Sequence, residues 1–466
     1  MTKRFMFIIG GNWHLYHKIA EVIKSHGYAI DAIAYNKTVY HHLKSVGIYD
    51  KVYDLLDLSK KNDLLGDYEC FNKLSLNQII HTDRVFSKQK YILGEPTENH
   101  LLRVAKTFDF LIDNSDVSAI VFEPGRSYAL IAEAIALAKF KKCYYPTWPK
   151  TSLGFEVATS SAGIFHQVEE DFLNDNICSN VTTGDVSTFI NDFRAGKIKP
   201  VFKNVHFENV KTKLLLRKIE SLKYLIFDIT AGDSIHKLKS FYSKKMTSIL
   251  NLWRSKRNRN YFKANVSEED KYFFYGMHYD PDLASLVWSR TMNNQVEVIR
   301  LISKSLPDGY KLYVKEHPAQ NFCRDRNFYK QLSSFHNVVL LSPKWHTDSL
   351  IKSSITSIVL SSTIGFESIM YGKKPIVLGD DFYKNEDLVF YVDDFRQLHG
   401  LFKSAIDNVD ITTEKLKRFV SAYISNIVLC DNIYKGTFAY KYIDKKEVEP
   451  IALFMIEDVE YKIETK

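Results

Sequence analysis

Short apolar runs alternate with amphipathic segments along residues 1–160. The apolar runs predict strands at Phe5–Ile9, Tyr28–Ala34, Ala119–Phe122 and Lys142–Tyr145. Between them, apolar residues recur at helical spacing, which predicts helices at Leu15–Ser25, Val39–Val46, Leu101–Ile112 and Tyr128–Ala138. This alternation is typical of a parallel sheet flanked by helices.

A second alternating series opens at Lys271. It predicts strands over 271–276, 310–314, 337–341, 356–360 and 375–378. The intervening helices are expected over 285–304, 326–334, 347–353 and 364–371. Residues 165–265 are polar and helical in pattern, and from Thr413 we expect a helix and a strongly charged tail.

Two such series predict an α/β protein of two Rossmann-like domains that face a cleft. We expect domains over 1–225 and 266–410, a basic helical connector over 226–265, and a C-terminal helix with its tail over 411–466. Ligands of such sheets bind beyond the carboxyl ends of the strands, so the loops there are the first candidates for a site. Gly10-Gly11 does not form the GxGxxG pattern of a dinucleotide site.

Composition indicates a folded protein of the cytoplasm. Of the 466 residues, 45% are hydrophobic and 25% charged, which argues against a disordered chain. The five cysteines are scattered and form no CxxC pair, which favours reduced thiols over disulfides or a zinc site. No stretch approaches the roughly 18 apolar residues of a membrane span. We also find no group with metal-ligand spacing and expect no metal and no cofactor.

The segment Ser234–Asn265 carries positive charge without a single acidic residue. Apolar residues recur among its basic ones at helical spacing, as in helices that lie on an anionic membrane surface. One interpretation is peripheral attachment to the inner face of the cytoplasmic membrane. The alternative is a solvated helix between domains. Nucleic acid is a weaker candidate because no binding module surrounds the segment. The basic residues are Lys237, Lys239, Lys244, Lys245, Arg254, Lys256, Arg257, Arg259 and Lys263.

Two loops of the second series have the chemistry of a phosphate site. Lys315-Glu316-His317-Pro318 directly follows a predicted strand, so a cation and an imidazole stand at its carboxyl end, with Pro318 restricting the chain. Such groups bind a phosphate and protonate a leaving oxygen. The alternative is an ordinary charged surface loop.

The second loop, Ser361-Ser362-Thr363, follows the next strand but one and opens a helix. Hydroxyls and free amides at a helix N-terminus bind anions, although they also form a plain N-cap. Glu367, one turn later, is placed to hold a ribose diol. Together the two loops favour a nucleotide ligand.

These motifs resemble those of known sugar transferases. The His-Pro and Ser-Ser/Thr motifs are similar to those that grip the donor in bacterial sialyl- and Kdo-transferases of the GT-B type (Kdo is 3-deoxy-manno-octulosonic acid). More closely, residues 270–385 resemble the capsule polysaccharide biosynthesis family, through Tyr275–Asp282, Tyr313–Pro318, Ser361–Glu367 and Gly372–Leu378. Asp280-Pro281-Asp282 stands where that family typically has Gln-Pro-Glu.

The resemblance implies a carboxylate that faces the donor from the first domain. Glu123, in Glu123-Pro-Gly-Arg126, follows a predicted strand and is the candidate, either as a general base or as a nucleophile. Arg126 can pair with the carboxylate of an acidic sugar. The alternative is that Glu123 caps the next helix and Arg126 is solvated. His278 and the nearby Asp280 follow the first strand of the second domain and are candidates for catalysis and substrate binding.

The sequence therefore predicts a glycosyltransferase that moves Kdo or a related acidic sugar from its CMP ester to a capsule or O-antigen glycan. Its partners would be the nucleotide-sugar donor, bound by the second domain, and a glycan or lipid-linked glycan acceptor, bound by the first. Three alternatives stay open: a GT-B enzyme using a UDP- or GDP-sugar, a polyol-phosphate transferase using a CDP-alcohol, and a non-catalytic carbohydrate-binding scaffold.

Overall fold

The fold is known from a computed structural model of the whole chain. The structure describes residues 3–10, 13–61, 76–82, 91–92, 95–123, 127–147, 150–151, 153–159, 166–174, 181–198, 250–263, 267, 269–280, 289, 292, 294–428 and 444–464.

The first unit is built on a sheet of order β15-β8-β7-β6-β1-β2-β3. The strands β3, β2, β1, β6 and β7 are parallel, and β8 and β15 add antiparallel partners at one edge. The strands are β1 (Arg4–Ile9), β2 (Ala29–Ala34), β3 (Lys51–Asp54), β6 (Val117–Phe122), β7 (Lys142–Thr147), β8 (Phe155–Ala158) and β15 (Ile427–Val428).

Helices cover both faces of this sheet. They are α1 (Trp13–Ser25), α2 (Lys37–Val46), α3 (Leu55–Lys61), α4 (Leu76–Thr82), α5 (Thr97–Asp113) and α6 (Ser127–Ala138). A small hairpin of β4 (Tyr91–Ile92) and β5 (Glu95–Pro96) precedes α5. Adjacent residues of β1 point to opposite faces, so Met6 and Ile8 belong to one buried cluster and Phe5, Phe7 and Ile9 to the other. The predicted strands of this half are confirmed.

The second unit is built on an all-parallel sheet of order β11-β10-β9-β12-β13-β14. Its strands are β9 (Tyr272–Gly276), β10 (Lys311–Lys315), β11 (Val338–Leu341), β12 (Ser357–Val359), β13 (Ile376–Val377) and β14 (Phe390–Tyr391). Its helices are α11 (Gln295–Ser305), α12 (Arg326–Ser333), α13 (Thr347–Ser353), α14 (Thr363–Met370) and α15 (Leu398–Asp407), with short 3₁₀ turns η4 (Arg259–Tyr261) and η6 (Phe395–Gln397). The two Rossmann-like sheets of the expected GT-B arrangement are thus present.

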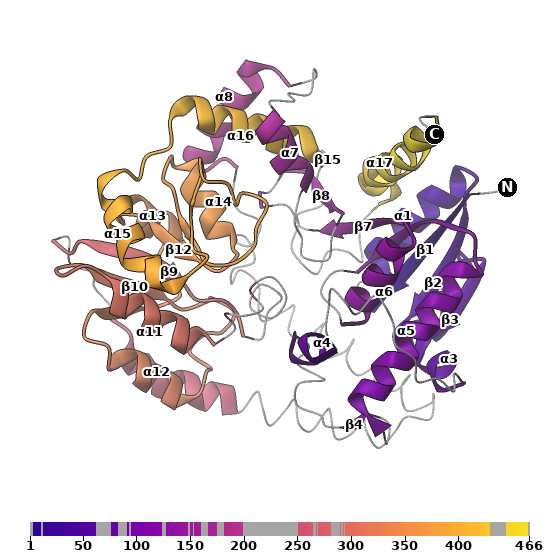
Figure 1. Cartoon of the computed structure of the whole chain (residues 1–466), viewed down its shortest axis with the longest axis horizontal. Helices are drawn as coiled ribbons and strands as arrows, with labels where there is room; N and C mark the ends of the chain where they lie inside the picture. The colour runs from indigo at the N-terminus through magenta and orange to yellow at the C-terminus, as the bar shows by residue number, and fades with distance from the viewer. Residues whose placement is uncertain are drawn as a thin grey trace.

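Three helices lie beside the second unit and link it to the first. In Figure 1, α7 (His166–Asn174), α8 (Thr183–Arg194) and α16 (Thr413–Asn426) run across the top of the molecule, beside the second unit. Helix α16 packs on α7 and α8, α8 contacts α14, and β15 then returns the chain to the first sheet. The chain therefore crosses between the units more than once, and the predicted domain boundaries remain predictions.

Two expectations about helices are wrong. The helix expected over 285–304 is not continuous: α11 begins at Gln295, because Asn294 caps it by accepting hydrogen bonds from the Val296 and Glu297 amides, and most of 285–293 lies outside the described residues. The charged tail expected after α16 includes the helix α17 (Lys445–Glu464). That helix packs on α1, and Figure 1 shows it back beside the first sheet. Its apolar side, with Val448, Ile451 and Met455, is fully buried.

Among the described residues, no helix is long and apolar enough to cross a membrane.

Candidate active site

The central feature of the site is a buried ion pair beneath the His-Pro loop. Glu316 follows β10, is inaccessible to solvent, and accepts hydrogen bonds from the Tyr329 hydroxyl and from the amide of His317. The guanidinium of Arg324 lies 3.5 Å from the same carboxylate. Burial raises the pKa of the Glu316 carboxyl, while Arg324 and Tyr329 partly oppose this rise.

Arg324 also connects the loops after β9 and β10. Its guanidinium donates to the carbonyl of His278 and lies 3.4 Å from the carboxylate of Asp280. Only 5% of the Arg324 residue is exposed, and the guanidinium stacks over the Phe328 ring at 4.7 Å. Glu316 and Arg324 therefore fix the positions of the two histidine loops. Because β9 and β10 are paired in parallel register, Gly276 to Lys315, these loops leave the same edge of the sheet.

His278 is held firmly by its backbone. Its amide donates to Gln295 Oε1 at 2.8 Å, and Gln295 Nε2 donates back to its carbonyl at 3.2 Å. His278 is 5% exposed, and its Nε2 has no hydrogen-bond partner among the described residues. Burial lowers its pKa to about 3, aided by the positive charges of His317, Arg324 and Lys150. His278 is therefore neutral at pH 7, within a positive environment.

His317 lies at the start of a turn. Its Nδ1 accepts the amide of Ala319 at 3.2 Å, and its carbonyl accepts the amide of Gln320 at 3.0 Å. Pro318 stands inside this turn. The His317 ring lies 5.9 Å from the ring of Tyr279, which precedes Asp280. Two of the predicted residues, His278 and His317, thus follow neighbouring parallel strands at the same edge of the sheet.

Lys315 is more buried than expected for a residue that binds a phosphate. It is 7% exposed, and its ammonium group donates to Thr347 Oγ1, at the first residue of α13, at 2.6 Å. Its predicted role in substrate binding remains a prediction.

In the loop Ser361–Thr363, Ser362 is an ordinary helix N-cap, as the alternative interpretation predicts. Its hydroxyl accepts a hydrogen bond from the amide of Ile364 at 3.1 Å, and α14 begins at the next residue, Thr363. The Ser361 hydroxyl donates to Asp381 at 3.1 Å, and the Tyr383 hydroxyl donates to the carbonyl of Ser362 at 2.7 Å. A helix N-terminus of this kind still presents amides to an anion.

Two residues of α14 show how closely this loop is packed. Gly365 must be a glycine, because a Cβ there would lie 2.4 Å from the Tyr383 hydroxyl oxygen. Glu367 is 4% exposed and lies one turn into the helix, as expected from the sequence. Its predicted contact with a ribose remains a prediction.

In the first unit, Glu123 lies at the carboxyl end of β6 and is 4% exposed. Its Oε2 accepts the amide of Gly10, at the end of β1, at 2.6 Å. A side chain at Gly10 would meet the Tyr35 ring at 2.6 Å and Glu123 Oε2 at 3.0 Å, so this close approach needs a glycine. The carboxylate thus stands at the edge of the sheet where ligands of parallel sheets bind. Arg126 lies outside the described residues.

Sequence reasoning missed Lys150, which links the two units. It follows β7 of the first sheet, yet its ammonium group lies 3.7 Å from the carboxylate of Asp381 and 5.6 Å from the centre of the Phe382 ring, both after β13 of the second. It also contributes to the positive potential at His278. Asp381 follows a strand, so the rule that ligands bind beyond the carboxyl ends of strands, which found Ser361, could also have found Asp381. For Lys150 and Arg324, only their charge distinguished them in the sequence.

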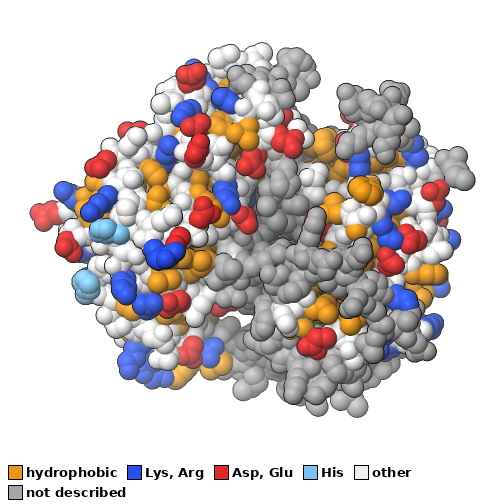
Figure 2. All heavy atoms as spheres, viewed as in Figure 1, with side chains coloured by type: hydrophobic (Ala, Val, Ile, Leu, Met, Phe, Trp, Pro, Cys, Tyr) orange, Lys and Arg blue, Asp and Glu red, His pale blue; other side chains and the backbone are white. Residues whose placement is uncertain are grey.

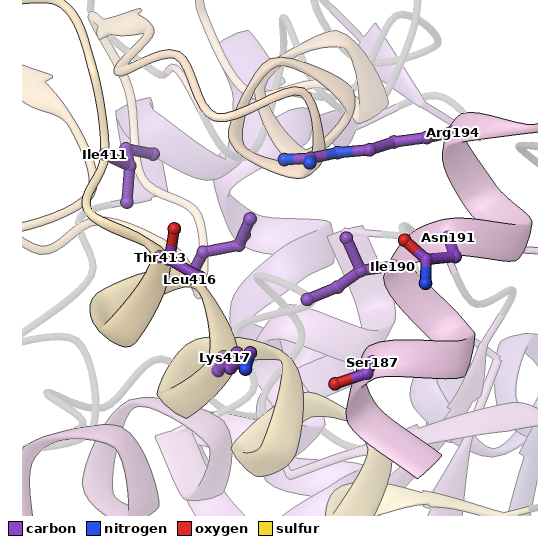
Figure 3. Close-up of a pocket in the computed structure, with 8 residues that line it drawn as sticks. All are labelled: Ser187, Ile190, Asn191, Arg194, Ile411, Thr413, Leu416 and Lys417. Atoms are coloured by element: carbon purple, nitrogen blue, oxygen red, sulfur yellow. The ribbon is translucent and has the colours of Figure 1, made fainter. Parts of the chain in front are cut away.

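A separate pocket lies between α8 and α16. Ile190, Asn191 and Arg194 line it from one helix, and Thr413, Leu416 and Lys417 from the other (Figure 3). None of the predicted site residues lines it.

The comparison with protein families concerns the second unit. Residues 232–390 match the model of the capsule polysaccharide biosynthesis protein family. The predicted resemblance to the capsule polysaccharide biosynthesis family is confirmed. The matched range contains every predicted site residue of the second unit, from His278 to Glu367. No curated protein matches the chain.

Several solved structures are similar to the chain at low identity. The β-Kdo 2,7 transferase KpsC of Thermosulfurimonas dismutans is 14% identical, with a TM-score of 0.35, over 83% of this chain and 98% of that one. A UDP-GlcNAc 2-epimerase from Neisseria meningitidis is 13% identical, with a TM-score of 0.30, over 98% and 99% of the two chains. The calicheamicin glycosyltransferase CalG4 is 7% identical, with a TM-score of 0.29, over 91% and 95%.

Proposed function

We propose that this protein is a glycosyltransferase that transfers Kdo or a related acidic sugar from a CMP-sugar to a bacterial capsule or O-antigen glycan. The match of residues 232–390 to the capsule polysaccharide biosynthesis family supports a role in making such a glycan. The site at the carboxyl edge of the second sheet supports a nucleotide-activated, anionic donor.

The observation that carries the proposal is the buried, unpartnered Nε2 of His278 in a positive environment. A buried polar atom without a partner is costly unless a ligand or water satisfies it. The positive groups around it, His317, Arg324 and Lys150, disfavour a further cation and favour an anion. A phosphate oxygen at this position would accept a hydrogen bond from the neutral imidazole.

Within this account, the second unit holds the leaving group. The bond between the anomeric carbon and the phosphate oxygen breaks, and CMP departs with the electron pair. Its phosphate is bound and its negative charge stabilised by His278 and His317, by Lys315, and by the amides at the start of α14. Because protein groups meet this charge, we propose that transfer needs no metal or other cofactor and that EDTA leaves turnover unchanged.

Glu123 serves the other reacting partner. As a general base, it takes the proton of the acceptor hydroxyl as that oxygen bonds to the anomeric carbon. As a nucleophile, it attacks that carbon and displaces CMP; the acceptor oxygen then displaces the carboxylate and loses its proton to water, with overall retention. In either role its Oε2 stays bound to the Gly10 amide, so the carboxylate has a fixed orientation. The scattered cysteines fit a reducing compartment, and we place the reaction in the cytoplasm.

The test is acceptor-dependent release of CMP. Purified protein is incubated with CMP-Kdo, with and without a capsule-type oligosaccharide, and CMP and the extended glycan are measured by mass spectrometry. We expect a product one acidic sugar longer than the acceptor. Parallel reactions with CDP-glycerol, UDP-sugars and GDP-sugars should give none. Product with one of these donors only would overturn the CMP-sugar proposal. Nucleotide binding without any product would identify a non-catalytic protein.

A further inference from the structure

The helix over residues 250–258 has its polar and apolar sides reversed relative to an ordinary surface helix. The side that packs on the protein is polar: Ser255 and Asn258 are 5% and 1% exposed. The Asn258 amide group donates to the carbonyls of Phe322 and Arg324, and the Asn251 carbonyl accepts from the Cys323 thiol. These three residues lie three to four positions apart and therefore share one face of the helix.

The opposite side carries large apolar residues in solvent. Trp253 is 56% exposed, and Leu250 and Leu252, which lie on its two flanks, are 42% and 69% exposed. A surface helix normally turns such residues toward the core. At 100° per residue, Trp253 points almost directly away from the face formed by Asn251, Ser255 and Asn258, and Lys256 lies about 130° from the centre of that face.

Basic residues surround this apolar patch. Lys256, Arg257 and Arg259 are exposed, and the Arg257 guanidinium stacks on the Trp253 ring at 4.8 Å. Arg254 is turned toward Asp325, at 3.6 Å, and so is partly neutralised. Residues 250–263 contain no acidic residue. Figure 2 shows Lys and Arg side chains beside hydrophobic ones at the lower left, where Figure 1 draws this helix next to α12.

We propose that this face docks on an anionic lipid bilayer. Exposed Leu and Trp enter the boundary between headgroups and acyl chains, and Lys256, Arg257 and Arg259 contact the phosphates of acidic headgroups. Trp is well suited to this boundary, because its ring is apolar and its N–H is polar. A second protein would also cover apolar residues, but the surrounding cations match a surface of uniform negative charge.

The docking face is anchored to the donor site. Asn258 binds the Arg324 carbonyl, and the Arg324 guanidinium binds the His278 carbonyl. A bilayer bound by this helix therefore lies on a side of the second unit that is fixed relative to the site. Docking would hold the enzyme near a lipid-linked acceptor without contributing a group to the chemistry.

The experiment measures binding of the full chain to vesicles by sedimentation. Vesicles of phosphatidylcholine alone are compared with vesicles that also contain phosphatidylglycerol, at low and at high salt. We expect binding to the anionic vesicles that weakens at high salt. Removing each cation should lower the partition coefficient about fivefold. The double variant Lys256→Glu/Arg257→Glu should lower it by at least about 25-fold.

A matched variant separates this face from general charge. Lys37 and Lys44 are exposed on α2 of the first unit, and Lys44 lies 5.7 Å from the centre of the Tyr40 ring, much as Arg257 lies over Trp253. Lys37→Glu/Lys44→Glu changes the net charge equally and should keep vesicle binding. Equal loss in both variants would mean that only net charge matters and would overturn the proposal.

Insertion of Trp253 into the bilayer can be measured separately, by fluorescence quenching. Brominated lipids quench Trp fluorescence at the membrane boundary, and the chain has five Trp. Trp253→Phe should abolish most of the quenching by anionic brominated vesicles, with melting temperature unchanged. Quenching that persists in this variant, or equal binding to neutral and anionic vesicles, would contradict docking by this helix. Binding to a soluble polyanion such as heparin, without binding to vesicles, would instead indicate a polyanion surface.

Discussion

The ammonium group of Lys150 lies 3.7 Å from the carboxylate of Asp381, across the boundary between the two units. Their side chains are 11% and 2% exposed, so the pair is buried. Glu156, on β8, accepts the backbone amide of Lys150 at 2.9 Å and the hydroxyl of Tyr423, on α16, at 3.0 Å. Lys150 thus faces two buried carboxylates and couples the first sheet to the edge of the second.

Replacement of Lys150 by Met should strongly destabilise the protein. It leaves Asp381 and Glu156 buried without this cation, and breaking a buried pair typically costs about 3–5 kcal/mol. Thermal denaturation followed by fluorescence measures the loss. Lys139→Met is the control, because Lys139 pairs at the surface with Asp113, whose side chain is 55% exposed, and such pairs contribute about 0–1 kcal/mol. Similar melting temperatures for both variants would show that the Lys150 pair is weak.

Glu156 should make stability depend on pH. Burial raises the pKa of its carboxyl from 4.5 to about 7. The folded state therefore holds the proton more tightly than the unfolded state does, and this contribution is fully present below pH 4.5. It is lost as pH rises through about 7. Glu156→Gln removes this titration, so its melting temperature should fall less than that of the wild type over this interval. Parallel curves for the two proteins would contradict the assignment.

Glu316 and Arg324 should behave as one unit. Each single variant, Glu316→Gln or Arg324→Met, leaves the other member buried with its partner lost. The double variant should therefore be more stable than the sum of the two single losses predicts, with a coupling of about 0.5–3 kcal/mol. Urea denaturation of the four proteins gives this value. Additive losses would show that the 3.5 Å approach in the structure contributes no net interaction.

The sequence predicted the frame of the site, for identifiable physical reasons. Buried parallel strands are short continuous apolar runs, so β9, β10 and β12 could be located closely. The loops after them follow by the strand-end rule. This is why His278, His317 and Ser361 were found, and why they lie at one edge of the sheet.

The missed features depend on contacts that are distant in the sequence. Nothing local distinguishes Lys150 from other lysines, because its partner Asp381 is far along the chain and in the other unit. Helix α17 was mistaken for a charged tail because its charged residues mask the narrow apolar side that packs on α1. The helical spacing of apolar residues extends to the N-terminal side of the cap at Asn294, so the sequence predicts too early a start for α11.

Glu123→Gln should abolish turnover without changing CMP affinity. Glutamine keeps an oxygen that can accept the Gly10 amide but loses the charge that a base or nucleophile needs. Loss of a general base typically lowers the rate about 10²–10⁴-fold. Initial rates and isothermal titration with CMP measure the two effects. Glu133→Gln, a buried carboxylate on α6, is the control and should stay active. Normal turnover of Glu123→Gln would reduce Glu123 to a structural role.

Calorimetric titration of CMP into the wild type and His317→Ala tests the central claim most directly. The claim is that a cytidine nucleotide binds at the edge of the second sheet beside His278 and His317. We predict that CMP binds the wild type more tightly than UMP or GMP and that His317→Ala loses this binding. His336→Ala, an exposed histidine beyond α12, should bind CMP normally. Equal affinity of the wild type for all three nucleotides, or unchanged CMP binding in His317→Ala, would contradict the account.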